Sequence, residues 1–372
     1  MWQDKIHTPA YVLDEKALLH NLEILKDVID TTGAHILLAS KAFSTYQVFP
    51  LIGEYLDGVT SSGLYEAKLG KEEMKKEVHT FSPAYKDEEM DEILEVSDHV
   101  VFNSVAQWEK WKHKAINKVS CGLRINPQYS EIEVDLYNPC APNSRMGIRK
   151  EQLQHVNIEG IEGLHFHTMC EQGADTLERT LHVIERDFHE LLHHVKWLNM
   201  GGGHHISKQG YDVHKLKKLI QHMQATYDVE VYLEPGEAVA INAGYLVSSV
   251  LDIIENDKKI AILDTSAACH MPDVLEMPYR PLVVGASTPN DKKHSYILAG
   301  NTCLAGDVIG EYSFEAPLKN KDRILFQDMA MYTMVKNNTF NGMPLPWIYL
   351  YTKEEELICL KEFGYEDFKG RL

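Results

Sequence analysis

Short apolar runs alternate with amphipathic stretches through the first two-thirds of the chain. Each run is four to seven residues long and mostly apolar on consecutive positions, which is typical of parallel strands covered on both faces. The intervening stretches are rich in Glu, Lys and Leu, and three of them, 64–77, 87–96 and 176–194, indicate helices that cover the strands. The eight predicted strands are 36–40, 58–62, 78–82, 99–103, 120–126, 163–168, 196–200 and 231–234.

Eight β–α units over this length favour an α/β fold of the (β/α)8 (TIM) barrel type. The alternative is an open doubly wound sheet, but no Gly-x-Gly-x-x-Gly turn follows an early strand. After Gly236 the pattern changes to strands separated by turns, at 247–254, 259–263, 295–298, 323–326 and 347–351, and residues 7–13 are also strand-like. We therefore expect the barrel over 14–240 and a second, mostly β domain built from 1–13 and 241–372.

The predicted barrel strands finish in polar residues or glycine. In a (β/α)8 barrel these carboxyl ends meet at one face, where the active site lies. Eight such endings together therefore predict a polar site at that face. The ends are Lys41, Ser61 with Ser62, Ser82, Asn103, Arg124 with Asn126, His165 with His167, Gly201 to Gly203, and Glu234.

Four of these ends suggest one chemistry. Lys41 presents an amine beside an apolar wall, which lowers a lysine pKa and suits Schiff-base formation. Gly201–Gly203 can bring backbone amides close to a phosphate, His167 can stack on a flat ring, and Glu234 can pair with a pyridinium N–H. Together they make a site for pyridoxal 5′-phosphate (PLP). Taken singly, each residue also has an ordinary explanation: Lys41 could be a solvated loop lysine, the glycines a tight turn, and His167 a core histidine.

Glu234 bears on the type of reaction. A carboxylate at that position keeps the ring nitrogen protonated, so that the ring accepts the electrons left by loss of CO2. An arginine there would leave the ring unprotonated and would suit racemisation better. Glu234 therefore favours decarboxylation.

Composition narrows the class of protein further. The formal net charge of −18 argues against nucleic-acid binding, and no apolar run reaches the length of a membrane span. The first residues lack a signal-peptide core, so we expect a cytoplasmic protein whose six scattered cysteines are reduced thiols. The pairs His193-His194 and His204-His205 lack zinc-site spacing, and we expect no metal.

At this point the chain resembles the fold type III (alanine racemase-like) PLP-dependent decarboxylases, which include ornithine and diaminopimelate decarboxylases. The resemblance spans nearly the whole chain, and several motifs in the right order are more specific than any one alone. These motifs are Ala39-Ser-Lys41, His165-Phe-His167, Gly201-Gly-Gly203, Glu234-Pro-Gly236, Gly300-Asn-Thr-Cys303, and Tyr332 followed by Asn341-Gly342.

The resemblance implies a PLP-binding barrel, a C-terminal β-barrel domain and a head-to-tail homodimer with active sites at the interface. It implies roles for single residues as well. Lys41 would carry the cofactor, His167 would stack on its ring, Glu234 would pair with the ring nitrogen, and Tyr332 would lie near it. Cys303 would enter the partner's site and protonate the product. Arg145 and Asp307 would pair across the dimer.

Departures from the wider family point to the substrate. Glu237 replaces the arginine that ornithine and diaminopimelate decarboxylases carry after Glu-Pro-Gly, and Asp273 stands near His270 where an arginine would hold a distal carboxylate. We expect these three residues to bind the far end of a cationic polyamine precursor. The motifs 138–140, 143–147, 203–205, 234–238, 270–273 and 303–307 are similar to those of the branch that converts carboxynorspermidine to norspermidine and carboxyspermidine to spermidine.

Alternatives stay open at this stage. Glu237 and Asp273 also fit ordinary surface charge. Ornithine or diaminopimelate decarboxylation is the second enzyme hypothesis, and a non-catalytic PLP-binding homologue is the third. Inactive homologues tend to lose the lysine or the cysteine, whereas this chain keeps both Lys41 and Cys303.

Overall fold

The computed structural model describes residues 2–154 and 156–372. It divides into two compact units, one covering Asn21–Val239 and the other combining the residues up to His20 with Ala240–Leu372. Over the described residues no helix has the length and apolar character needed to cross a membrane.

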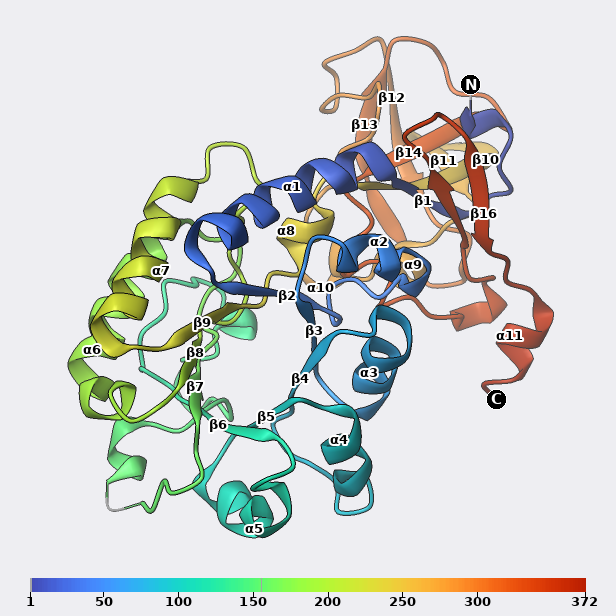
Figure 1. Cartoon of the computed structure of the whole chain (residues 1–372). Helices are drawn as coiled ribbons and strands as arrows, with labels where there is room; N and C mark the ends of the chain where they lie inside the picture. Colours follow the sequence, from blue (N-terminus) through green and yellow to red (C-terminus); the bar gives the residue numbers. More distant parts are fainter. Residues whose placement is uncertain (1, 155) are drawn as a thin grey trace. The chain divides into compact units, whose positions relative to one another are not determined.

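The first unit contains a closed barrel of eight strands, in sequence order around the ring (Figure 1). Every neighbouring pair is parallel, and the ring closes between the last strand and the first, where His35 pairs with Tyr232. The (β/α)8 prediction is therefore confirmed. The strands are β2 (His35–Ala39), β3 (Gly58–Ser61), β4 (Glu77–Phe81), β5 (His99–Phe102), β6 (Ser120–Arg124), β7 (Gly163–His165), β8 (Trp197–Asn199) and β9 (Glu230–Leu233).

Helices join most successive strands and follow the amphipathic stretches, whereas β6 and β7 are joined by a segment with two 3-10 turns. Leu177, Leu181, Ile184 and Phe188 of α6 recur at helical spacing and are buried, which is why this segment is a helix lying on the barrel. The predicted helix at 64–77 is shorter in the structure: α3 covers Leu64–Leu69, a π-helical turn continues it over Gly70–Met74, and β4 begins at Glu77. The helices are α1 (Glu15–Thr32), α2 (Phe49–Gly53), α3 (Leu64–Leu69), α4 (Met90–Val96), α5 (Val105–Ala115), α6 (Ala174–Leu192), α7 (Val213–Tyr227) and α8 (Glu237–Ala240).

The second unit is built on one mixed sheet, ordered β13-β12-β11-β10-β1-β15-β16, with β14 also paired to β10. The opening strand β1 joins it, antiparallel to β10 and parallel to β15. These strands form a branched sheet, and the closed ring among the described strands is β2–β9. The strands are β1 (Ala10–Asp14), β10 (Gly244–Asn256), β11 (Lys258–Leu263), β12 (His294–Ala299), β13 (Val308–Phe314), β14 (Arg323–Gln327), β15 (Trp347–Tyr351) and β16 (Leu357–Lys361).

Two strands of this sheet, β13 and β16, are absent from the sequence prediction. In β13 glycine and polar residues interrupt the apolar positions. β16 contains the apolar run 357–360, but it lies at the edge of the sheet and is half-exposed. Short helical elements connect strands in both units or lie near the ends of the chain. They are α9 (Ala267–His270), α10 (Asp273–Glu276), α11 (Tyr365–Lys369) and the 3-10 turns Trp2–Asp4, Tyr46–Val48, Asp135–Tyr137, Lys150–Leu153 and Phe340–Gly342.

Candidate active site

The barrel brings Lys41 and His167 together. Both follow the carboxyl end of a strand, β2 and β7, and Nζ of Lys41 lies 3.4 Å from Nε2 of His167. The lysine side chain stays accessible to solvent although protein surrounds it, because it stands at the open mouth of the barrel. Burial within the barrel and, next, the charge of Arg124 lower the pKa of Lys41. A larger share of this amine is therefore neutral, and hence nucleophilic, than for a free lysine.

His167 is held from its other side by the glycine segment after β8. Its Nδ1 lies 3.1 Å from the Gly202 carbonyl oxygen and 3.2 Å from the Gly202 amide nitrogen. If Nε2 accepts from the Lys41 ammonium, Nδ1 carries the proton and donates to the Gly202 carbonyl. The imidazole ring is thus positioned between the lysine and this loop.

The three glycines are explained by close backbone crossings. A Cβ on Gly202 would lie 2.4 Å from the Glu234 carbonyl oxygen, and one on Gly203, whose φ is +81°, would lie 2.0 Å from the Met169 carbonyl oxygen. The Gly201 amide donates a hydrogen bond to Asn199 Oδ1, and the Gly202 amide nitrogen lies 3.2 Å from His167 Nδ1. The phosphate role expected for this segment stays a prediction, since a phosphate would have to compete with these contacts.

Glu234 follows β9 and points into the barrel. Its Oε2 lies 3.2 Å from Nε2 of His165, and its Oε1 accepts a 2.8 Å hydrogen bond from the Asn199 amide. Burial by itself raises the pKa of the carboxyl, but the interactions with His165 and Asn199 lower it by more, so that the pKa lies below its ordinary value. Glu234 is therefore an ionised carboxylate in a fixed orientation.

Arg124 is a further charged residue of this site to which the sequence analysis assigned no role. It ends β6, is 4% exposed, and donates from Nη2 to the His167 carbonyl oxygen at 3.1 Å, while its guanidinium lies over the Phe81 ring at 4.5 Å. Burial lowers its pKa to about 10, which leaves it charged at neutral pH. The signal that could have identified Arg124 is that a charged residue ends a buried strand of the barrel.

Glu237 is an enclosed residue and not ordinary surface charge. It begins α8, its side chain is 12% exposed, and Oε2 lies 2.5 Å from Nε2 of the buried His205. Glu171 lies close to both. The interpretation of Glu237 as surface charge is therefore wrong, whereas its predicted contact with substrate stays a prediction.

Cys303, Tyr332 and Asp273 belong to the second unit. Cys303 is exposed, and its amide donates to Asn341 Oδ1 at 2.8 Å, so its predicted role as a proton donor stays a prediction. This hydrogen bond joins two of the motifs on which the family resemblance rests. Tyr332 is half-buried, with a positive φ of 53°. Asp273 opens α10 and pairs with Lys336 at 2.6 Å.

His270 is not available to a substrate. It is fully buried, and both ring nitrogens are engaged, Nδ1 with Thr265 Oγ1 at 2.9 Å and Nε2 with the Pro344 carbonyl at 3.0 Å. Burial lowers its pKa to about 4, so it is neutral. The predicted substrate contact of His270 is corrected to a role in packing.

Asp307 is likewise satisfied within its own unit. It is 3% exposed, Oδ1 accepts from the Ala267 amide at 2.7 Å, and Oδ2 accepts from Thr302 Oγ1 at 2.6 Å. A buried carboxylate with these partners is not placed for the predicted pairing across a dimer. Arg145 is exposed and, with Arg149, lines a cavity of about 930 Å³ in the first unit, so an interface role for it stays a prediction.

A lysine beside a histidine, with an ionised carboxylate, at the carboxyl ends of a (β/α)8 barrel defines the barrel class of pyridoxal enzymes. Residues 10–330 match the family model described as pyridoxal-dependent decarboxylase, C-terminal sheet domain. The chain belongs to the pyridoxal-dependent decarboxylase family.

Individual relatives extend along the whole chain. The carboxynorspermidine/carboxyspermidine decarboxylase of Campylobacter jejuni is 49% identical over 100% of both chains. The carboxyaminopropylagmatine decarboxylase of Synechocystis is 41% identical over 98% of this chain and 95% of its own length. The solved structure of carboxynorspermidine decarboxylase from Campylobacter jejuni, complexed with norspermidine, aligns with a TM-score of 0.94 at 48% identity, covering 99% of this chain and 100% of that one.

Proposed function

We propose that this protein binds PLP through Lys41 and decarboxylates carboxynorspermidine or carboxyspermidine to norspermidine or spermidine. The observation that carries the chemistry is that one barrel mouth holds both a Lys41 amine of lowered pKa and an ionised Glu234. The choice of substrate is supported by the full-length relative at 49% identity.

The residues present fit the cofactor. Lys41 offers an accessible amine that can hold an aldehyde, and the His167 ring 3.4 Å away offers a flat face. Glu234, fixed by His165 and Asn199, offers an anionic acceptor that keeps a proton on a pyridine nitrogen. When bound, PLP supplies a ring that accepts the electron pair left by the departing CO2.

We assign the closing proton transfer to Cys303. After loss of CO2 the substrate carbon needs one proton, and the Cys303 thiol is exposed on the second unit. In this proposal two copies of the chain form a homodimer, and Cys303 of one copy serves the barrel of the other. The exposed Arg145 beside its cavity is a candidate for that interface.

We assign recognition of the substrate amines to Glu237 and Asp273. Each carboxylate already has a cationic or hydrogen-bonding neighbour, His205 and Lys336 respectively. A substrate ammonium would therefore share or displace that neighbour, so amine binding at these positions is an exchange of partners. Displacing an existing ion pair lowers the net gain per contact.

Release of CO2 from a panel of substrates tests this function. The panel contains carboxynorspermidine, carboxyspermidine, carboxyaminopropylagmatine, meso-diaminopimelate and ornithine, each at equal concentration with PLP-loaded protein. We expect the largest kcat/KM for the first two. The third is included because a relative of that name is 41% identical along the chain.

Each other outcome of the panel has a distinct meaning. Preference for diaminopimelate or ornithine would overturn the substrate assignment while leaving the chemistry intact. Preference for carboxyaminopropylagmatine would support an amine-rich substrate but would change the proposed group at its far end. No CO2 from any substrate, with PLP bound, would favour the non-catalytic homologue.

A further inference from the structure

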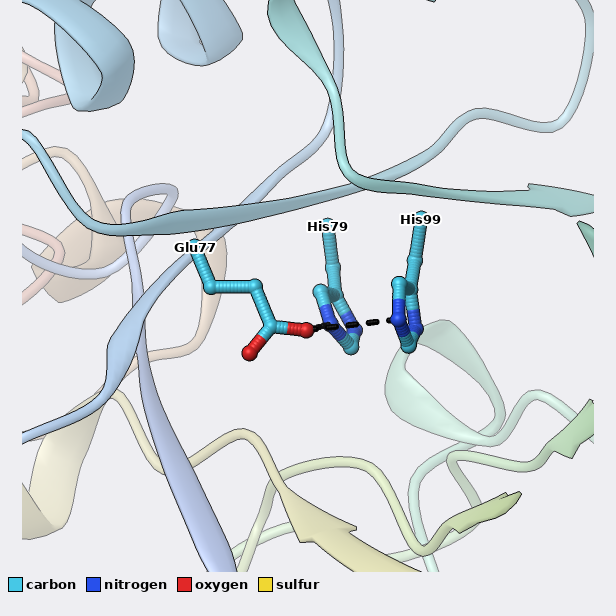
Figure 2. Close-up of side chains that lie close together, drawn as sticks. All are labelled: Glu77, His79 and His99. Carbon is cyan, nitrogen blue, oxygen red and sulfur yellow. Dashed lines mark hydrogen bonds and ion pairs between the residues drawn. The ribbon is translucent and has the colours of Figure 1, made fainter. Parts of the chain in front are cut away.

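The amino ends of two barrel strands carry a second cluster of chemically active side chains. Glu77 and His79 lie on β4 and His99 opens β5, at the end of the barrel opposite Lys41. Oε1 of Glu77 lies 2.7 Å from Nε2 of His79 and 3.3 Å from Nε2 of His99 (Figure 2). Both imidazole rings thus direct the same type of nitrogen at one carboxylate oxygen.

Two imidazoles and one carboxylate form a ligand set used for Zn²⁺. In this cluster each of Glu77, His79 and His99 offers one ligand atom, and these atoms all lie within 4.8 Å of one another. The rings are stacked 4.0 Å apart and inclined by 21°. His79 is 1% exposed, so the cluster extends from the barrel interior toward the amino ends of the strands.

Hydrogen bonding leaves part of this cluster unexplained. The Nδ1 atoms of His79 and His99 are both buried and have no hydrogen-bond partner. The Glu77 carboxylate only accepts, so Nε2 carries the proton on each ring that donates to it. To bind a cation through Nε2, a ring would give up this contact with Glu77 and hold its proton at Nδ1.

An entry path lies beside His99. A cavity of about 510 Å³ is bordered by His99 together with the acidic residues Asp98 and Glu162. Lys118 also borders this cavity, and Glu162 and Asp98 are paired with Lys196 and Lys71. His99 stacks on His79 at 4.0 Å and on Trp197 at 5.0 Å, and it would have to turn out of these stacks toward the cavity to bind an ion. That turn is needed, because an ion in the plane of one stacked ring lies outside the plane of the other.

We propose that Glu77, His79 and His99 bind one divalent transition-metal ion, with Zn²⁺ the best match to the donor set. The ion would link β4 to β5 at the end of the barrel that does not carry the cofactor, and its role would be structural. The sequence analysis expected no metal from the spacing of the two adjacent histidine pairs, and it did not consider these residues, which come from two strands and form no local metal motif. The proposal is independent of the proposed function.

Cobalt titration of the tag-free, PLP-loaded protein tests the site. Co²⁺ bound by nitrogen and oxygen ligands in a tetrahedral site gives visible absorption, and Zn²⁺ should displace it. We expect one equivalent of Co²⁺ to bind, and Glu77→Gln and His99→Gln each to weaken binding by at least about 100-fold. Zn²⁺ should also raise the Tm of the unmodified protein and leave the Tm of both variants unchanged.

Two matched controls separate this site from other histidines. His222→Ala removes a surface histidine that is paired with Glu185 at 2.8 Å, and it should leave Co²⁺ binding unchanged. His205→Ala alters the other three-residue group among the described residues, Glu171, His205 and Glu237. Loss of the signal in His205→Ala alone would move the metal to that group and overturn the proposal.

Two further results would also overturn it. One is the absence of saturable Co²⁺ binding to the unmodified protein. The other is binding that survives both Glu77→Gln and His99→Gln, provided that circular dichroism shows both variants folded. Glutamine keeps the length of glutamate and a hydrogen-bonding group, so Glu77→Gln is the variant expected to keep the fold.

Discussion

Nε2 of His165 lies 3.2 Å from Oε2 of Glu234; His165 ends β7, and Glu234 directly follows β9. Asn199 of β8, the strand between them, holds the other carboxylate oxygen at 2.8 Å. Three adjacent strands therefore position one ionised group before any ligand arrives. A carboxylate fixed in this way costs no reorganisation when it pairs with a protonated ring.

Replacing Lys41 by alanine should remove the covalent attachment of PLP. We expect purified Lys41→Ala to lack the visible absorbance of the attached cofactor and to release no CO2. Lys68→Ala, on the surface and paired with Glu92, is the matched control and should behave as the unmodified protein. Visible absorbance that persists in Lys41→Ala would show that another amine carries the cofactor.

Replacing Glu234 by glutamine should separate cofactor binding from turnover. Glutamine keeps the shape and still meets Asn199, but it removes the charge that holds a proton on the ring nitrogen. We expect PLP to remain bound and kcat to fall by about 100-fold or more. Steady-state kinetics with Glu185→Gln as a surface control provide the measurement, and an unchanged kcat would contradict the role of Glu234.

The pH dependence of PLP attachment should report the lowered pKa of Lys41. Only the neutral amine attacks an aldehyde, so the rate rises with pH and levels off above the lysine pKa. We expect the midpoint to lie below that of a free lysine, about 10.4. Stopped-flow mixing of cofactor-free protein with PLP at a series of pH values measures it.

Removing the charge of Arg124 should move that midpoint upward. A positive neighbour disfavours the lysine ammonium, so its loss raises the lysine pKa. Arg124→Met should therefore shift the midpoint to higher pH, whereas Arg124→Lys, which keeps the charge, should shift it less. If the midpoint of both variants equals that of the unmodified protein, the charge of Arg124 does not lower the Lys41 pKa, and burial alone would account for it.

Asp273 and Lys336 should have opposite effects on KM if the substrate amine competes for Asp273. We expect Asp273→Asn to raise KM for the polyamine precursor by about 10-fold or more, since a charge-assisted hydrogen bond contributes about 1.5–3 kcal/mol. Lys336→Met frees the carboxylate and should lower KM. An unchanged KM in Asp273→Asn would mean that Asp273 and Lys336 stabilise the fold and do not bind the substrate.

Gly163→Ala should destabilise the barrel. A Cβ at this position of β7 would lie 1.9 Å from Cδ2 of Trp197, whose indole packs inside the ring. Overpacking of this kind costs about 1–3 kcal/mol, measurable as a lower Tm. Gly63→Ala, where a Cβ meets nothing within 4 Å, is the control and should leave the Tm nearly unchanged.

Local pattern was enough to predict the barrel and the residues at its mouth. The eight runs are recognisable because each strand is buried on both faces, and this alone requires consecutive apolar positions. Lys41, His167 and Glu234 were identified because parallel strands deliver their carboxyl ends to one face. β13 was missed because glycine and polar residues interrupt its apolar positions, and β16 was missed although it contains the apolar run 357–360.

Partners across the fold were decided only by the tertiary structure. His165 and Glu234 are 69 residues apart, and Asp273 and Lys336 are 63 apart, so no local spacing reveals either pair. The burial of His270 could not be predicted from the sequence either, because the residue type alone does not distinguish a buried histidine from an exposed one. Side-chain contacts depend on which strands become neighbours and in what register, and that is settled only when the ring closes.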